Sequence, residues 1–300
     1  RDGRAAGIEM ALDIDRLLHC MELAETGRPD GSRTWILIVS LGVYNAIQQL
    51  LFARATLFAS VYHHHKVRAC DCMVKACFEN FLAGGTRFGK TGNGNRGITL
   101  KSAADFLFLT DLDFSAEALC HPSNAEEHQL IHDLLYRRLL KRVLMVSTHS
   151  IQEFDKDEGQ KASYREFLNQ RNIDGRLRAL AAEIHKAAKA ACSRQRVWLD
   201  IPKPPSFEKP GSSLINIASR GAVPQLEKLS KFIPIEKWVE TYQQYYARSY
   251  LYGPSDRDTR VRLAIEGIQL LNARFGLRLN RTAVADDIRD DVLKRSPLGP

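Results

Sequence analysis

The chain has 300 residues, of which 44% are hydrophobic, and a formal net charge of +8. A chain of this length buries roughly 75% of the surface that its unfolded form exposes, so an intrinsically disordered polymer is excluded and a packed core is expected. The basic balance favours phosphate-bearing partners, although a solvated basic surface explains it as well. No apolar run reaches the ~18 residues that span a bilayer. Six cysteines without disulfide or zinc spacing indicate reduced thiols. We therefore expect a cytoplasmic protein with no membrane partner.

The hydrophobic periodicity predicts a mainly helical chain. Helices are expected at residues 10–26, 35–82, 124–149, 160–192, 225–252 and 256–275, with short helical turns within 99–119. Arg28-Pro29-Asp30-Gly31 is typical of a turn, and the glycine-rich segment 84–97 of a loop. Strands are expected only at 197–201 and 214–217, and residues 285–300 are interpreted as a loose tail.

One segment matches the phosphate-binding loop pattern GxxxxGK[ST], through Gly84, Gly89, Lys90 and Thr91. That loop works between a buried strand and a helix, where backbone N–H groups face the phosphates. Here the preceding residues are predicted to be helical, and the following glycines do not favour a helix start. An exposed basic loop is the competing interpretation.

Histidine and cysteine clusters give further candidates. His128 and His132 lie four residues apart, a spacing that can hold a metal on one helix face. A histidine pair at a surface or interface is the favoured interpretation, because Gln129 stands where the zincin motif has Glu. His63, His64 and His65 are consecutive, so on a helix they point in different directions and cannot all bind one ion. Cys70, Cys72 and Cys77 are interpreted as small buried hydrophobes.

The best chemical candidate is the acidic run Asp13-Ile14-Asp15-Arg16, followed by His19. Taken alone, the run is typical of a helix cap with a surface ion pair, which contributes under ~1 kcal/mol. Its interpretation changes when it is considered together with residues further along the chain.

Several segments resemble the HD-domain phosphohydrolases. The run Asp13-Ile14-Asp15-Arg16 matches a D-x-D-[KR] pattern, and residues 53–64, ARATLFASVYHH, match an A-R-x-x-[ML]-x-x-x-[VA]-Y-x-H pattern. Weaker matches are TDLD at 110–113, YRRLLKR at 136–142 and VWLDIPKPP at 197–205. Among HD-domain proteins the chain is similar to the deoxynucleoside triphosphate triphosphohydrolases, both the bacterial dGTPase-like and the vertebrate sterile-alpha-motif/HD members.

The resemblance implies metal-assisted hydrolysis of a deoxynucleoside triphosphate to a deoxynucleoside and triphosphate. A divalent metal, which the residues do not identify as Mg, Mn, Fe or Zn, would activate a bound water, and cations would neutralise the phosphates. By position, Asp15 would be the last metal ligand. Arg16 and Arg54 would contact phosphates, and Tyr62 would pack against the sugar. His19 stands where the family often has Tyr and would join the substrate-binding group. If so, Asp15, Arg54 and Tyr62 should converge on one cleft.

The resemblance also implies a fold and a domain organisation. The expected fold is mainly α, the C-terminal part of an HD-domain-like helical bundle, followed by a smaller α+β region with a few strands. The expected domains are 1–82 (HD-type helical domain), 83–195 (helical extension) and 196–300 (α+β region). In the family the His and His-Asp ligands precede D-x-D-[KR], and nothing precedes Arg1 here. We therefore expect an incomplete metal site and no activity for the chain as given, and interpret the downstream doublet His132-Asp133 as coincidence.

Other functions remain open beside this one. A non-catalytic regulatory or single-stranded nucleic-acid-binding relative would account for the net charge of +8 and for the Arg/Lys-rich stretch 161–196. A P-loop nucleotide hydrolase that uses Lys90 ranks last. The resemblance further implies that the protein assembles into a homo-oligomer.

Overall fold

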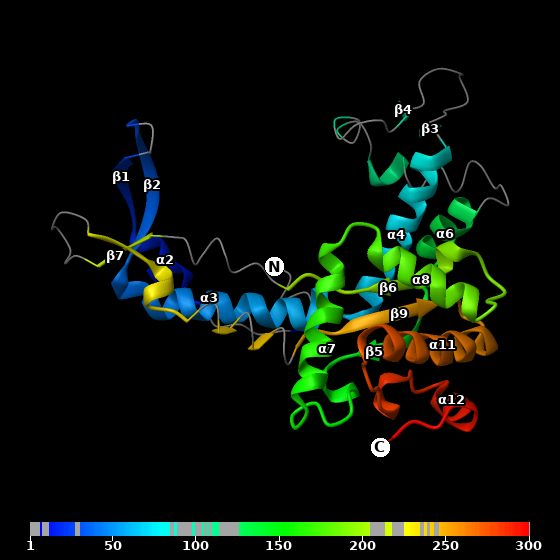
Figure 1. Cartoon of the computed structure of the whole chain (residues 1–300). Helices are drawn as coiled ribbons and strands as arrows, with labels where there is room; N and C mark the ends of the chain where they lie inside the picture. The colour runs from blue at the N-terminus through cyan, green and yellow to red at the C-terminus, as the bar shows by residue number, and fades with distance from the viewer. Residues whose placement is uncertain are drawn as a thin grey trace. The chain divides into compact units, whose positions relative to one another are not determined.

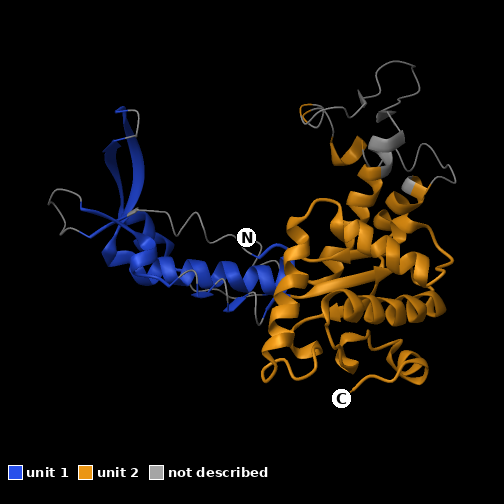
Figure 2. Ribbon diagram, in the orientation of Figure 1, with its two compact units in different colours: residues 1–63, 203–247 blue, residues 64–202, 248–300 orange. Residues whose placement is uncertain are grey.

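The computed structural model divides the chain into two compact units, each built from two separate stretches of sequence (Figure 2). Unit 1 comprises residues 1–63 and 203–247, and unit 2 comprises residues 64–202 and 248–300. The residues that the structure describes are 7, 12–27, 31–84, 87–88, 98–99, 104, 107, 110–113, 126–204, 214–217, 225–234, 237–238, 241–242 and 246–299.

Unit 1 combines a sheet with two helices (Figure 1). Its elements are α2 (Ile14–His19), β1 (Met21–Gly27), β2 (Arg33–Ser40), α3 (Tyr44–Leu57), the π-helical turn η2 (Phe58–Tyr62), β7 (Leu214–Asn216) and β8 (Leu226–Lys228). The strand order is β1-β2-β7-β8. β1 and β2 form an antiparallel hairpin, β2 pairs with β7 in parallel, and β7 pairs with β8 antiparallel.

The core of unit 1 lies where α3 meets the second chain segment. Its buried residues are Val43, Ala46, Ile47, Leu51, Ile215, Leu229 and Ile233. Leu17 and Cys20 of the α2 region pack against this cluster, and the Tyr44 hydroxyl donates to the carbonyl of Phe232 at 3.2 Å. The core therefore depends on residues almost 190 positions apart in sequence.

Unit 2 is larger and has a central antiparallel sheet, β5-β9-β6 (Figure 1). Its helices are α4 (His65–Gly84), α6 (Glu126–Leu135), α7 (Glu158–Asn169), α8 (Arg176–Ala187), α11 (Arg257–Phe275) and α12 (Arg289–Arg295). Its strands are β5 (Lys141–Val146), β6 (Trp198–Asp200) and β9 (Ser249–Gly253), with a separate short pair, β3 (Arg87–Phe88) and β4 (Ile98–Thr99).

Alternating side chains of this sheet pack into two different hydrophobic cores. Trp198, Tyr250 and Tyr252 pack with α4 and α6, whereas Leu199 and Leu251 pack with α7, α8 and α11. This is the period of two that a strand imposes on its side chains. The sheet is thus covered by helices on both faces, and unit 2 is a three-layer α/β/α arrangement.

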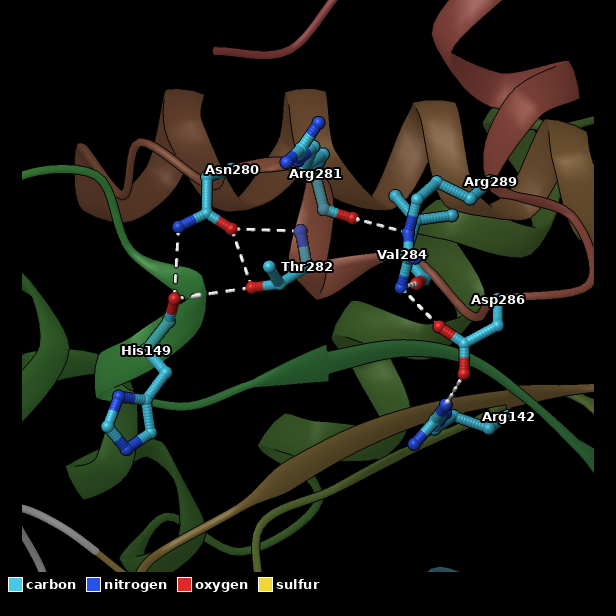
Figure 3. A network of polar contacts seen from close by, with 8 residues as sticks. All are labelled: Arg142, His149, Asn280, Arg281, Thr282, Val284, Asp286 and Arg289. Carbon is cyan, nitrogen blue, oxygen red and sulfur yellow. Dashed lines mark hydrogen bonds and ion pairs between the residues drawn. The ribbon is translucent and has the colours of Figure 1, made fainter. Parts of the chain in front are cut away.

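The C-terminal segment is tied back onto unit 2 by polar contacts (Figure 3). Asn280 Nδ2 and Thr282 Oγ1 donate to the carbonyl of His149, at 3.0 and 3.2 Å. Arg289 donates to the carbonyls of Arg281 and Val284 and pairs with Asp286. Residues 285–300 were expected to be a loose tail, and this prediction is wrong, because α12 and its buried Val292 belong to the core.

The expected mainly α, HD-domain-like helical bundle is also wrong, because the molecule is a mixed α+β protein with sheets in both units. Three helix predictions failed for a common reason. Residues 21–27 and 33–40 form a hairpin, and residues 141–146 form β5. WILIV at 35–39 and VLMV at 143–146 are rich in β-branched and large apolar residues, which favour a half-buried pleated surface.

Other predictions hold. Helix 256–275 is α11, whereas the turn expected at residues 28–31 lies, except for Gly31, outside the described residues. The strands at 197–201 and 214–217 are β6 and β7. By contrast, the predicted helix 225–252 contains β8 and most of β9. In the described part of the chain, no helix combines the length and apolar character needed to cross a membrane.

Candidate functional site

The acidic run lies on α2, the short first helix of unit 1. Asp13 caps this helix, since its Oδ1 accepts a hydrogen bond from the backbone N–H of Arg16 at 3.0 Å. A capping acid stabilises a helix start by satisfying a free N–H group. The expectation that Asp13 acts as the cap is confirmed, which leaves Asp15 as the carboxylate of the run that is available for chemistry.

The neighbours of Asp15 are held in place by local bonds. A terminal nitrogen (Nη2) of Arg16 donates to the carbonyl of Gly42 at 2.8 Å, and the His19 ring bonds through Nδ1 to the carbonyl of Asp15 at 2.7 Å. The Asp15 side chain is exposed and forms no hydrogen bond or ion pair with another described residue. An ionised carboxylate with open acceptor sites is a suitable ligand for a hard divalent cation.

Large apolar side chains surround this carboxylate on the surface. Ile14 is 53% exposed and Leu18 is 58% exposed, although both belong to a helix of six residues. They lie four positions apart and therefore on the same helix face. A helix that shows apolar and acidic side chains together to water has the composition of a contact surface.

The second sequence motif lies near the end of α3 and in η2. The Arg54 guanidinium lies 5.2 Å from the centroid of the Phe58 ring, and the Phe58 and Tyr62 rings meet edge to face at 5.1 Å. The π-helical turn continues the helix through these residues, and such turns are frequent at functional sites. Arg54, Phe58 and Tyr62 thus form one cationic and aromatic row.

A buried histidine, His63, packs against this row of side chains. His63 is 6% exposed, its Nδ1 is 3.0 Å from the Tyr242 hydroxyl, and its ring meets Phe58 at 5.4 Å. Of the three consecutive histidines, this one is therefore part of the packing. Sequence reasoning did not identify the contact, because the two partners are 179 residues apart.

The structure does not bring the two motifs together. Arg16 is fixed at Gly42, immediately before α3, whereas Arg54 lies in the last turn of that helix. Gly42 and Arg54 are twelve residues apart, and a rise of 1.5 Å per residue places them about 18 Å apart along the axis of α3. Asp15, Arg16 and His19 therefore form one group, and Arg54 and Tyr62 form another at the opposite end of α3.

An aromatic groove opens beside the second half of α3. It has a volume of about 410 Å³, and Ala55 and Ala59 contribute small side chains to its wall. Phe52 stacks on Trp238 at 4.5 Å and Tyr242 on Tyr246 at 5.7 Å along its edges. Neither Arg54 nor Tyr62 lines the groove, so it is separate from the row that they form.

The remaining sequence candidates gain no metal site. Asp133 accepts a hydrogen bond from Arg196 at 2.9 Å, which occupies the acid of the His132-Asp133 doublet. In the described ranges, no three His, Cys, Asp or Glu side chains are arranged to hold an ion. Residues 85–86 and 89–91 of the P-loop pattern lie outside the described residues, and the residues that precede them are helical, as α4 extends to Gly84.

The match to a known protein family covers most of the chain, from the acidic run onward. Residues 12–274 match the model of a family described as the HD associated region, and the chain belongs to that family. It is therefore an HD-domain-related protein, which confirms the broader part of the resemblance. None of the curated proteins matches the chain.

Proposed function

We propose that the chain completes the active site of a metal-dependent HD-domain phosphohydrolase, with Asp15 as one metal ligand. The observation that carries the proposal is the state of the Asp15 carboxylate, which is exposed and unbonded among the described residues while Asp13 and Arg16 beside it are engaged. An HD domain would supply the other ligands, because the described part of the chain has no further cluster of metal-binding side chains.

The surface around Asp15 supports an HD domain as the partner. The exposed Ile14 and Leu18 flank the carboxylate on α2. On the β1–β2 hairpin, Leu23 pairs with Leu37 and both are more than half exposed, as is Trp35. Exposed apolar side chains in such number mark a docking surface, and the family of this chain is defined by its association with HD domains.

The proposed substrate is a deoxynucleoside triphosphate, on the strength of the two motifs. A bound divalent metal would polarise a phosphoryl oxygen and activate water. Hydrolysis to a deoxynucleoside and triphosphate breaks the bond between O5′ and the α-phosphorus. The Arg16 guanidinium uses one donor on Gly42 and has further N–H groups for a phosphate. Arg54 and Tyr62 lie at the other end of α3 and are not assigned to the substrate held at Asp15.

The alternative of a basic nucleic-acid-binding module receives less support. Several arginines of the basic stretch are committed to internal partners. Arg178 lies over the Trp198 ring at 3.8 Å and contacts Glu79. Arg196 pairs with Glu126 and Asp133. Such side chains hold unit 2 together and are not displayed as a phosphate-binding stripe.

The test is hydrolysis by the complete protein, or by this chain in complex with its HD domain, with manganese and each of the four deoxynucleoside triphosphates. Asp15→Asn should lower kcat at least about 100-fold, because a metal ligand is lost. Asp13→Asn keeps a capping side chain and is the matched control, expected to change kcat less than about threefold. Arg54→Ala should leave KM unchanged, because Arg54 lies at the opposite end of α3 from Asp15.

Two outcomes would contradict the proposal. Equal activity of Asp15→Asn and the unmodified protein would remove Asp15 from the metal site. If the active protein releases inorganic phosphate from a phosphomonoester but no triphosphate from any deoxynucleotide, the HD assignment stands and the substrate is wrong.

A further inference from the structure

Unit 2 contains a second cavity, of about 820 Å³, that the proposed function does not use. The start of α4 contributes His65 and Lys66 to its wall, and the connection from α6 to β5 contributes Arg137 and Lys141. Arg260 of α11 and the segment 285–287 close the remaining side. Three regions that are far apart in the sequence thus contribute cations to one cavity.

Three of these cations are available for a ligand. Lys66, Arg137 and Lys141 are exposed, and none of them forms an ion pair with another residue in the described part of the chain. The acids at the wall are already engaged. Figure 3 shows Asp286 between Arg142, at 3.4 Å, and Arg289, and Asp287 accepts from Arg260 at 2.6 Å. The cavity therefore keeps a clear excess of positive charge.

Arg260 is the buried anchor of this wall. Its side chain is 7% exposed, and beyond its bond to Asp287 its Nε is buried without a partner among the described residues. A buried donor without an acceptor is rare in folded proteins because it loses its bond to water. Arg260 also lines the cavity, so its charge adds to the positive potential there.

The backbone conformation at Arg137 is unusual for an arginine. Its φ is 57°, in the left-handed region, just after the end of α6. Glycine or asparagine usually occupies such a position, since a larger side chain is strained there. Here an arginine stands at this turn, and its side chain lines the cavity.

The electrostatic environment of the cavity acts on His65. Burial lowers the pKa of His65, and the nearby His64, Arg142 and Lys66 lower it further, to about 4. The imidazole is therefore neutral near pH 7 and does not contribute to the charge of the site. A neutral ring among cations can still donate one hydrogen bond.

We propose that this cavity binds an inorganic condensed phosphate, such as pyrophosphate or triphosphate, through Lys66, Arg137, Lys141 and Arg260. Charge and buried donors select a compact polyanion. Among the described residues that line the cavity the only ring is the His65 imidazole, with no Phe, Tyr or Trp beside it, so a base would find at most one partly buried ring on which to stack. The ligand is therefore an inorganic anion and not a nucleotide, and the site is independent of Asp15.

The test is isothermal titration of the full chain with inorganic triphosphate, pyrophosphate, orthophosphate and dGTP at fixed ionic strength. The triple variant Lys66→Ala, Arg137→Ala, Lys141→Ala should bind triphosphate about tenfold or more weakly, since each exposed ion pair contributes a few-fold. Lys186→Ala with Lys189→Ala removes exposed cations of unit 2 that do not line the cavity, and is the matched control.

A second measurement locates the anion without relying on affinity. In an NMR titration of the imidazole, bound triphosphate should raise the pKa of His65 from about 4, because an anion favours the charged ring. Three results would overturn the proposal: no binding of triphosphate or pyrophosphate to the unmodified chain, an equal loss in the control variant, or tighter binding of dGTP that the triple variant abolishes. Arg54→Ala in unit 1 should leave triphosphate binding here unchanged.

Discussion

The two units differ in how they bury their apolar side chains. Unit 2 encloses a sheet between helices on both faces, and its C-terminal segment is held by polar contacts such as that of Asn280 with His149. Unit 1 buries a smaller core and leaves Ile14, Leu18, Trp35 and Leu37 more than half exposed. Water-exposed apolar area is unfavourable by about 25 cal/mol per Å². Under the proposed function, the exposed apolar side chains of α2 and of the hairpin are the surface that an HD domain covers, whereas the sheet of unit 2 is enclosed by its own helices.

The two units also differ in how their charged side chains are used. The arginines of unit 2 form many internal ion pairs, and a largely buried one joins Arg68 to Asp200 through two bonds, at 2.7 and 2.6 Å. In unit 1 the chemically interesting acid, Asp15, forms no ion pair within the described residues. Ion pairs thus stabilise the interior of unit 2, while each unit also keeps charged side chains that are exposed and form no ion pair among the described residues, Asp15 in unit 1 and Lys66, Arg137 and Lys141 in unit 2.

The largest expected effect comes from breaking the Arg68–Asp200 pair. Burial alone would lower the pKa of Arg68, but the hydrogen bond and charge of Asp200 outweigh it and raise that pKa. Asp200→Ala leaves a buried guanidinium with only Asp71, so the free energy of unfolding should fall by about 3–5 kcal/mol. Urea denaturation measures it. Asp71→Asn, at the half-exposed partner, should cost under ~1 kcal/mol. Similar losses in both variants would contradict a buried structural pair.

A smaller effect, of a different kind, is expected in unit 1. Trp35→Asp with Leu37→Asp adds charge to the exposed face of the hairpin, so the free energy of unfolding should change by less than about 1 kcal/mol. Binding to an HD domain should weaken by about 2 kcal/mol or more, as expected for a tryptophan at an interface. Analytical ultracentrifugation and titration calorimetry separate the two. Thr34→Asp, on the half-buried opposite face, is the comparison variant. Unchanged binding would show that this face is not covered by an HD domain.

The smallest expected effect is the pH dependence contributed by His65. The pKa of His65 is about 4 in the folded chain against an ordinary value of 6.5, so only the unfolded chain takes up a proton between these values. Stability from this group is complete above pH 6.5 and is lost as the pH falls toward 4. His65→Gln should flatten the pH dependence of the unfolding free energy in this window. An unchanged profile would mean that the ring titrates normally.

Local sequence signals predicted some elements of the fold and missed others. Asp13 as a cap and the strands at 197–201 and 214–217 followed from local signals. The hairpin did not, because Leu17, Leu18 and Met21 form a helical stripe that continues across the real boundary at Cys20. Pairing with Arg33–Ser40 overrides that local pattern, and the β-branched residues of that strand were the signal that could have revealed it.

The candidate site residues also differ in how far the sequence alone predicts them. Asp15 could be found from the order of residues in one motif, whereas its distance from Arg54 depends on how α2 packs at the start of α3. The cavity of Lys66, Arg137, Lys141 and Arg260 had no local signature at all. Its residues come from three separate segments that meet only through the packing around the β5-β9-β6 sheet.

The interleaving of the two units has a consequence for the order of synthesis. Strand β2 pairs in parallel with β7, joining Val39 to Ile215, so a ribosome has made most of unit 2 before unit 1 receives its last strands. Unit 2 in turn waits for β9 and α11, which come after residue 247. Neither unit corresponds to a continuous stretch of the gene. The β1–β2 hairpin can form early, but the second edge of β2 has no partner strand until β7 has been synthesised.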